Sequence, residues 1–195
     1  KHDMKNHMAV LQNLIRKRYS GEDEEIRQYF EGMHQSVEQL DSRVHTGNAV
    51  SDAVVGSKFR YAAKKIKGIK LDAKGFMLSD AVTIKAYDMG IILNNGLDNA
   101  IEACMRMREK QPDAGAYITI RSFTAKNMYF IEIENSFDGV ALFHKDSGLP
   151  ISTKEDKEVH GIGLKNIRKC AVKYGGDMDC IVKGNKFTLS VMVKS

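Results

Sequence analysis

The sequence predicts an α+β chain in two parts, an antiparallel helical hairpin followed by an α/β sandwich with helices on one face of a mixed or antiparallel sheet. Three observations support this fold class. Two apolar stripes at helical spacing occupy residues 4–44, a longer amphipathic helical pattern spans residues 84–108, and two strand pairs with alternating apolar and polar residues follow it. We assign residues 1–48 to the first domain and residues 49–195 to the second.

The first part contains two helices with regular apolar stripes. The first stripe consists of Met4, Met8, Leu11 and Ile15, and the second of Ile26, Phe30, Met33, Val37, Leu40 and Val44. Gly21 lies between them and suits a left-handed cap position. Because a lone hairpin buries little apolar surface, we expect a homodimer through residues 1–46, which would form a four-helix bundle.

The second part begins after the break at residues 46–48. We expect a helix over 51–67, short strands at 69–71 and 75–77, the helix over 84–108, a hairpin of 117–124 with 128–135, a helix following residues 160–163, and a closing hairpin of 178–182 with 187–193. Residues 136–160 show little periodicity, which in a compact domain is typical of a functional lid or a disordered loop.

The amino-acid composition argues against several classes of protein. The 195 residues have ordinary apolar content and a net charge of +5 without a long basic run, which favours a globular protein that does not bind nucleic acid. The three cysteines have no metal spacing and are odd in number, so we expect reduced core thiols, as in cytosolic proteins. The sequence starts inside a helical pattern without Met, and we expect it to be a fragment of a longer protein.

The polar face of the 84–108 helix is its most informative feature. Asp88, Asn95, Asn99, Glu102 and Arg106 lie opposite the apolar stripe of Leu93, Leu97, Ala100, Ile101 and Cys104. Asparagine is a poor helix former, so two of them at i and i+4 have a cost. A single Asn would be an ordinary surface residue, whereas the pair favours a site for hydrated Mg²⁺ bound with a polyphosphate.

Two further segments have polar groups suited to a nucleotide. Gly161 and Gly163 open a helix, whose free amides and dipole can hold phosphate oxygens. Loop glycines often serve only turns, and the nearby cations Lys165, Arg168 and Lys169 would equally fit a solvated helix face. Asn135 ends a buried strand, where a polar side chain can bond an adenine edge, although taken alone a plain strand-to-loop transition is the better interpretation.

The order of these segments resembles the GHKL ATPase superfamily over essentially the whole chain. Asn95-Gly96-Leu97-Asp98-Asn99-Ala100-Ile101-Glu102-Ala103 is similar to its N box, and His160-Gly161-Ile162-Gly163-Leu164-Lys165-Asn166 to its second glycine box. Ser152-Thr153-Lys154 resembles the lid of one subgroup, and His2-Asp3-Met4-Lys5-Asn6-His7 the phosphoacceptor box of sensor histidine kinases. The subgroup resembled is the peptide-sensing, quorum-sensing type whose partners are LytTR-type response regulators.

The resemblance implies a GHKL (Bergerat) sandwich over residues 49–195 that binds ATP and Mg²⁺. Asn99 would ligate magnesium and Asn95 would face the triphosphate. The remaining ATP contacts implied by the motifs are Asn135, Gly139, Lys154, Gly161, Gly163 and Leu164. The adenine box departs from the family pattern, since Asn135 replaces an aspartate and Phe137 replaces a glycine. An amide oxygen still accepts a hydrogen bond from the adenine amino group, so we expect adenine selectivity to persist.

The resemblance makes His2 the phosphorylated residue of a dimerisation and phosphotransfer hairpin. His2 and Asn6 lie roughly opposite the apolar stripe of their helix, so an exposed neutral imidazole can attack the γ-phosphoryl group. Asp3 would orient the ring or take its proton. Asn6, one turn along, would orient water for dephosphorylating the response regulator.

The sequence therefore predicts an ATP-dependent protein-histidine kinase of a two-component system, the cytoplasmic part of a membrane receptor anchored upstream of this fragment. It would pass the phosphoryl group to a response-regulator aspartate. Two alternatives remain. A hydrolysing GHKL ATPase needs a carboxylate base one turn before the magnesium asparagine, where this chain has Asn95. A nucleotide-binding scaffold without transfer activity would explain the irregular adenine box.

Overall fold

The computed structural model describes residues 44–78, 82–143, 150 and 162–194, all within Arg43–Ser195, the second of the chain's two units. The predicted helical hairpin, with His2, Asp3, Asn6 and nearly all of the expected dimer contact, lies outside the described residues. Lys154, Gly161 and most of the expected lid also lie outside them. The domain boundary at residue 48 therefore stays a prediction.

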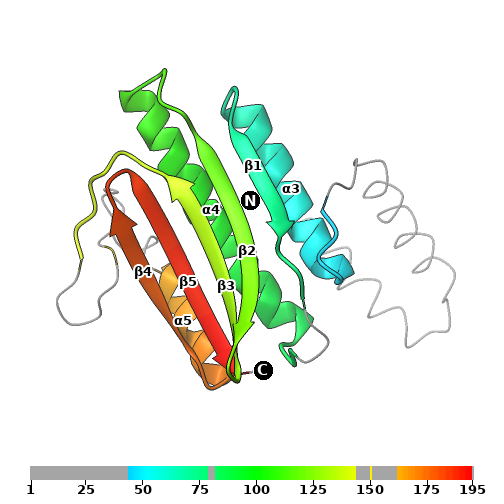
Figure 1. Ribbon diagram of the computed structural model, residues 1–195. Helices are drawn as coiled ribbons and strands as arrows, with labels where there is room; N and C mark the ends of the chain where they lie inside the picture. The colour runs from blue at the N-terminus through cyan, green and yellow to red at the C-terminus, as the bar shows by residue number, and fades with distance from the viewer. Residues whose placement is uncertain (1–43, 79–81, 144–149, 151–161, 195) are drawn as a thin grey trace, which may run out of the picture. The chain divides into compact units, whose positions relative to one another are not determined.

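The second unit is built on a mixed five-stranded sheet, one of the two sheet types that the sequence predicts (Figure 1). The strand order is β1-β2-β3-β5-β4, with β1 parallel to β2 and every other pair antiparallel. The bounds are β1 Lys70–Gly75, β2 Tyr117–Ala125, β3 Met128–Ser136, β4 Asp177–Lys183 and β5 Lys186–Lys194. Both predicted hairpins, β2 with β3 and β4 with β5, are confirmed.

Helices α3 (Ala49–Lys65), α4 (Ala86–Lys110) and α5 (Ile162–Lys173) cover one face of this sheet (Figure 1). Alternate residues of the central strands point towards the helices and are buried, which gives a single apolar core. The strand residues of this core are Ile118, Ile120, Tyr129, Ile131, Ile133, Leu189, Val191 and Val193. The predicted α+β sandwich is therefore confirmed for the described residues.

Helix α4 is the central helix of the layer, and its predicted apolar stripe is confirmed as buried. Gly96 lies where α4 crosses the sheet, and a β-carbon there would be 2.5 Å from Ile133 Cδ1. Glycine at this position lets the helix backbone approach β3 more closely than any other residue would. This close packing fixes the height of the α4 polar face above the sheet.

The connection between α3 and α4 differs from the prediction. Two strands are expected at 69–71 and 75–77, whereas the structure has one, β1, which pairs with β2 and loses register between Asp72 and Gly75. The chain then turns, with the Phe76 amide donating to the Ala73 carbonyl, and Phe76 enters the core. The apolar pair at 76 and 77 therefore marks a turn and not a strand, because Phe76 reaches the core without pairing in the sheet while Met77 stays exposed.

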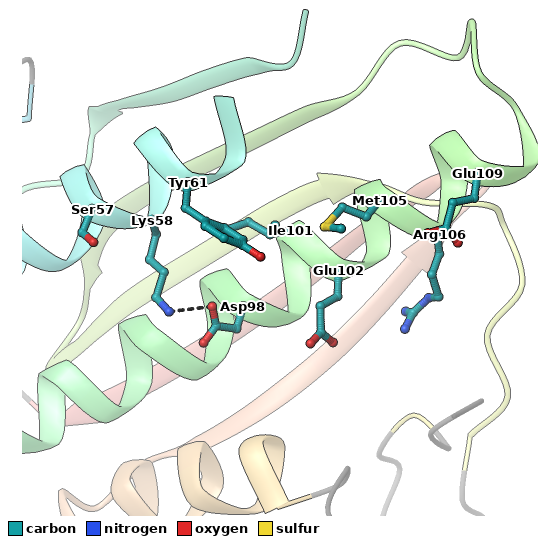
Figure 2. A pocket seen from close by; sticks show the side chains of 9 residues that line it. All are labelled: Ser57, Lys58, Tyr61, Asp98, Ile101, Glu102, Met105, Arg106 and Glu109. Carbon is teal, nitrogen blue, oxygen red and sulfur yellow. Dashed lines mark hydrogen bonds and ion pairs between the residues drawn. The ribbon is translucent and has the colours of Figure 1, made fainter. Parts of the chain in front are cut away.

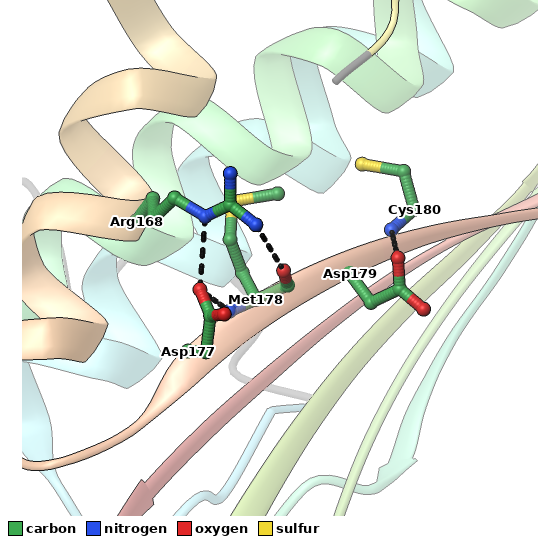
Figure 3. Close-up of polar contacts among 5 residues, drawn as sticks. All are labelled: Arg168, Asp177, Met178, Asp179 and Cys180. Atoms are coloured by element: carbon green, nitrogen blue, oxygen red, sulfur yellow. Dashed lines mark hydrogen bonds and ion pairs between the residues drawn. The ribbon is translucent and has the colours of Figure 1, made fainter. Parts of the chain in front are cut away.

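Polar contacts attach α5 to the edge strand β4 (Figure 3). Arg168 Nε donates to Asp177 Oδ1 at 2.9 Å, and Asp177 Oδ1 also accepts from the Met178 amide at 2.8 Å. The hydrogen bond from Arg168 lowers the pKa of the Asp177 carboxyl, and the Met178 amide acts in the same direction. Arg168 is thus engaged in holding α5 on the sheet, which adds a structural role to the two interpretations considered from sequence.

All three cysteines are free and buried, as predicted. Burial raises the pKa of the Cys180 thiol to about 12, so this thiol is neutral in the core. Across the described part of the chain, no helix is long and apolar enough to cross a membrane.

Candidate functional site

The site is built around Asn95 and Asn99 in the middle of α4. The Asn95 Nδ2 donates to the Ile91 carbonyl at 2.8 Å, one turn back along the same helix. Only the amide nitrogen can make this bond, so the Oδ1 atom is directed away from the helix backbone. The neighbouring Asn94 makes the same bond to Gly90, also at 2.8 Å. Asn95 is therefore held in one orientation that presents an acceptor.

The side-chain amide of Asn99 differs from that of Asn95 in its hydrogen bonding. Its Nδ2 is buried and has no hydrogen-bond partner among the described residues. A buried polar group without a partner costs about 1–3 kcal/mol, and such groups are few in native structures. The unsatisfied atom is a donor, which an acceptor such as a phosphate oxygen would satisfy, whereas Mg²⁺ would be bound through the amide oxygen Oδ1.

The first turn of α5 contacts α4 at Asn95. A β-carbon on Gly163 would lie 3.2 Å from Asn95 Oδ1 and 3.7 Å from Asn95 Cβ. The absence of a side chain at 163 thus allows the α5 backbone to approach the asparagine face directly. Helix α5 carries no acidic residue in its first turn, so its positive end faces this region without a carboxylate of its own. Leu164 packs against the apolar core beside this contact.

Asn135 lies at the end of β3, on the side of the sheet that faces the helices. It continues the buried alternation of Ile131 and Ile133 and is itself only 2 % exposed. Its Nδ2 donates to the Ser136 carbonyl at 2.9 Å, which leaves Oδ1 as the acceptor end of the amide, without a hydrogen bond to another described residue. The amide therefore offers an acceptor, as an aspartate would, without placing a charge in the core.

The strand end that carries Asn135 is attached to α4 through Cys104 and Ser136, two residues that the sequence does not mark as part of a site. Cys104 Sγ donates to the Ser136 carbonyl at 3.3 Å, and Ser136 Oγ accepts from the Tyr117 amide at 3.0 Å. Burial raises the pKa of the Cys104 thiol, which keeps it a neutral donor. The helical stripe marks Cys104 as a core residue, but no local signal in the sequence shows its contact with Ser136.

The residues after Asn135 turn towards the β4–β5 turn. The Phe137 amide donates to the Asn185 carbonyl at 3.0 Å, and the buried Phe137 ring meets Phe187 edge to face at 6.1 Å between centroids. Gly139 has a φ of 81°, and a β-carbon there would be 3.2 Å from Asn185 Oδ1. The described contacts of Gly139 are therefore with this turn, not with the α4 asparagines.

A second polar cluster fixes the far end of α5 to the start of α4. Asp88 is buried and accepts from Lys173 Nζ and from the Tyr174 hydroxyl, both at 2.6 Å. The Tyr174 oxygen accepts in turn from the Lys85 amide at 3.1 Å, at the uncapped start of α4. The Lys173 hydrogen bond, followed by that of Tyr174, lowers the pKa of Asp88, and Asp88 raises the pKa of Lys173. Asp88, predicted on the open polar face, is instead a buried link between the two helices.

A groove of about 600 Å³ runs between α3 and α4 (Figure 2). Lys58 of α3 and Asp98 of α4 form an ion pair across it, at 2.6 Å. Tyr61, Glu102 and Arg106 are among its lining residues, but none of the described ATP-binding candidates is. Within the described ranges, no group of three or more His, Cys, Asp or Glu side chains is placed to hold a metal ion, and the magnesium assignment to Asn99 stays a prediction.

Comparison with known proteins shows the family to which this chain belongs. A sequence profile of the GHKL domain matches residues 84–194, which span α4, the β2–β3 hairpin, α5 and the closing hairpin. The chain belongs to the GHKL family. No curated protein sequence gives a significant match.

Solved structures show the same fold for this GHKL domain. The nucleotide-free catalytic domain of histidine kinase ThkA is 19 % identical over 72 % of this chain and 90 % of its own, with a TM-score of 0.50. The Acinetobacter baumannii histidine kinase AdeS is 16 % identical over 100 % of this chain and 98 % of its own, with a TM-score of 0.50. The histidine kinase domain of the Erythrobacter litoralis EL346 blue-light-activated kinase is 11 % identical over 82 % of this chain and 68 % of its own, with a TM-score of 0.52.

Proposed function

We propose that this chain is an ATP-dependent protein-histidine kinase that phosphorylates His2 and passes the phosphoryl group to an aspartate of a response regulator. The observation that carries the proposal is the contact of Gly163 with Asn95, with the unpartnered Asn99 amide one turn further along α4. A helix start without a side chain at 163 and two asparagines on the facing helix form a cradle for the phosphates of a nucleotide. Membership of the GHKL family and the fold of histidine kinase catalytic domains support this assignment.

The roles proposed within the pocket come from the motif resemblance. Asn99 would hold Mg²⁺ and Asn95 would face the triphosphate, while the Asn135 oxygen would accept from the adenine amino group. Gly161, Gly163 and Leu164 would line the phosphate side, Gly139 would support the adenine box, and Lys154 would reach a phosphate. Magnesium, when bound, neutralises charge on the phosphates.

The transfer step forms one bond as another breaks. A ring nitrogen of His2 forms a bond to the γ-phosphorus while the bond from that phosphorus to the β,γ-bridging oxygen breaks, and ADP leaves. Asp3 takes the imidazole proton. In the second step a response-regulator carboxylate attacks the phosphorus, the P–N bond breaks and the imidazole regains a proton. In a separate phosphatase activity, Asn6 would orient a water that attacks the phosphorus of the regulator's phosphoaspartate, so that the acyl P–O bond breaks and inorganic phosphate leaves.

The chemistry at position 95 favours a kinase over a hydrolysing ATPase. Water must lose a proton as it attacks phosphorus, and a carboxylate one turn before the magnesium residue would accept that proton. Asn95 is a neutral amide whose nitrogen is engaged with Ile91, so it cannot act as that base. A scaffold that binds nucleotide without transferring phosphate remains the second candidate, favoured by the replacement of the first adenine-box glycine by the buried Phe137.

We further propose the wider setting of this kinase. The chain would form a homodimer through residues 1–46 and act with a LytTR-type response regulator in peptide-based quorum sensing. It would be the cytoplasmic domain of a receptor anchored in the membrane upstream of this segment. The apolar stripes of the hairpin and the motif resemblance support these points.

The decisive experiment incubates the purified chain with Mg²⁺ and γ-labelled ATP and measures protein-bound label that is acid-labile and base-stable. The wild type should become labelled, and His2→Ala should not. His7→Ala, in the same box, is the matched control and should still be labelled. Undiminished label in His2→Ala would overturn the phosphoacceptor assignment, whereas nucleotide binding with no label in either protein would favour the scaffold.

A further inference from the structure

The positive charge of this chain is concentrated in one stretch that the kinase proposal does not use. Between Asp52 and Asp72 there are six Lys or Arg residues and no carboxylate. The whole chain has 30 Lys and Arg against 25 Asp and Glu, so without these six it has 24 cations against 25 carboxylates. The entire positive excess therefore lies on α3 and at the start of β1.

Four of these cations surround the turn between α3 and β1, at the edge of the sheet (Figure 1). Residues 64–70 read Lys-Lys-Ile-Lys-Gly-Ile-Lys, and all four lysines are exposed. Ile66 is buried and Ile69 packs against the core, so the turn is anchored by its apolar residues while its lysines project. We call Lys64, Lys65, Lys67 and Lys70 the basic turn.

The described part of the chain places no carboxylate in an ion pair with the basic turn. Within residues 44–78, 82–143 and 162–194, none of the four lysines forms an ion pair, whereas Lys58 on the same helix is paired with Asp98. A further cation lies beside them, since Arg108 Nη2 donates to the Lys67 carbonyl at 3.1 Å. Lys65 Nζ lies 5.9 Å from the centre of the Tyr61 ring, which is 48 % exposed.

Structural explanations account for part of this pattern. Lys64 and Lys65 complement the negative end of the α3 dipole, and Lys70 protects an edge strand from pairing with another chain. Neither effect requires Lys67, nor the absence of every carboxylate over 19 residues. A positive electrostatic field concentrated at the α3–β1 turn is the arrangement expected of a surface that binds an anionic partner.

We propose that the basic turn docks on an anionic lipid surface. Lysine is depleted in protein–protein interfaces, and its ammonium lacks the planar fork that reads a fixed carboxylate or phosphate. Flexible lysines suit a fluid layer of head groups, which adapts to them, and clusters of four or more such cations are typical of segments that bind acidic lipids. Exposed Tyr61 has the apolar ring and polar tip found at membrane interfaces.

This docking is compatible with an open nucleotide site. Arg108 of α4 is hydrogen-bonded to Lys67 of the basic turn. It follows Asn95 by 13 residues, which correspond to about 20 Å of helix. A surface that contacts the α3–β1 turn therefore lies well away from the contact between Asn95 and Gly163. The inference does not depend on the proposed kinase activity, and the two can fail separately.

The test is co-sedimentation of the whole chain with vesicles of phosphatidylcholine alone or of equal parts phosphatidylcholine and phosphatidylglycerol. We expect binding only to the anionic vesicles, with loss at high salt as screening grows. The variant Lys64→Gln/Lys67→Gln should bind roughly 25-fold more weakly, at about fivefold per lysine. Lys126→Gln/Lys194→Gln, which loses the same charge from exposed lysines elsewhere, should bind as the wild type does.

Three outcomes would overturn the proposal. The first is no binding to anionic vesicles, and the second is an equal loss in the two double variants, which would show an effect of net charge alone. The third is binding to duplex DNA under the same salt with none to vesicles, which would assign the basic turn to nucleic acid. Circular dichroism of each variant checks that the fold is retained, and ATP binding, measured in parallel, should be unchanged in all of them.

Discussion

Gly163, in the first turn of α5, lies so close to Asn95 of α4 that a β-carbon at 163 would be 3.2 Å from the asparagine oxygen. The asparagine cannot easily move aside, because its amide nitrogen donates to the Ile91 carbonyl at 2.8 Å. The distance between the two helices is thus set by the missing side chain at 163. Both residues belong to motifs that resemble the nucleotide-binding boxes of the GHKL family.

Substitution of Gly163 by alanine should weaken binding of Mg·ATP about tenfold, since a shift of a few tenths of an ångström in either helix disturbs the phosphate cradle. The free energy of unfolding should change by less than about 1 kcal/mol, because alanine is the better helix former. Calorimetric titration with a non-hydrolysable ATP analogue measures the first quantity and urea denaturation the second. An unchanged affinity would show that the phosphates do not lie at this contact.

Replacement of Asn99 by leucine should abolish Mg·ATP binding while leaving the protein as stable or more stable. The buried amide has no partner among the described residues, so removing it should raise the free energy of unfolding by up to about 1 kcal/mol. Chemical denaturation without nucleotide tests this, and nucleotide titration tests the loss of binding. A variant less stable by more than that amount would indicate that Asn99 serves the fold instead of a ligand.

Two glycines of α4 should respond oppositely to alanine. A β-carbon at Gly90 meets nothing within 4 Å, so Gly90→Ala should stabilise the domain by about 0.5–1 kcal/mol. At Gly96 the β-carbon would lie 2.5 Å from Ile133 and 3.1 Å from Leu189, and Gly96→Ala should destabilise by about 1–3 kcal/mol. Thermal and urea unfolding of the pair provide the measurement. Similar effects at both sites would refute the close crossing of α4 over β3.

Substitution of Asp88 by asparagine should lower the melting temperature by several degrees at neutral pH, with a dependence on pH that identifies the group. The hydrogen bonds from Lys173 and Tyr174 lower the folded-state pKa of Asp88 below its ordinary 3.8. Ionised Asp88 therefore stabilises the fold at pH above 3.8, and this stabilisation is lost as the pH falls through the lowered folded-state pKa.

Melting curves of the wild type and Asp88→Asn across this range should converge in acid. Asp113→Asn removes the same charge from an exposed residue in the turn after α4 and is the control, with a melting temperature close to that of the wild type throughout. A difference between wild type and Asp88→Asn that persists unchanged into strong acid would mean that packing, not the ion pair, links the two helix ends.

Local sequence patterns are enough to place the main elements of the second domain. Helical spacing in Leu93, Leu97 and Ile101 and the alternation of apolar and polar residues in 117–124 and 128–135 are local signals, so α4 and the β2–β3 hairpin could be placed from them. The same periodicity separates the polar face of α4 from its core face. The motifs resemble those of the GHKL family without any knowledge of the fold. Asn95, Asn99, Asn135 and Gly163 were accessible in this way because each belongs to such a local pattern.

Packing of the elements, in contrast, selects which distant residues meet. No local pattern connects Asp88 with Tyr174, Cys104 with Ser136, or Phe137 with Phe187, since each pair depends on how α4, α5 and the strands are stacked. The display of charge also depends on packing. The lysines of residues 64–70 project from the turn between α3 and β1 because the intervening isoleucines pack into the core. Periodicity reports which side of an element is buried, whereas only packing determines what lies against that side.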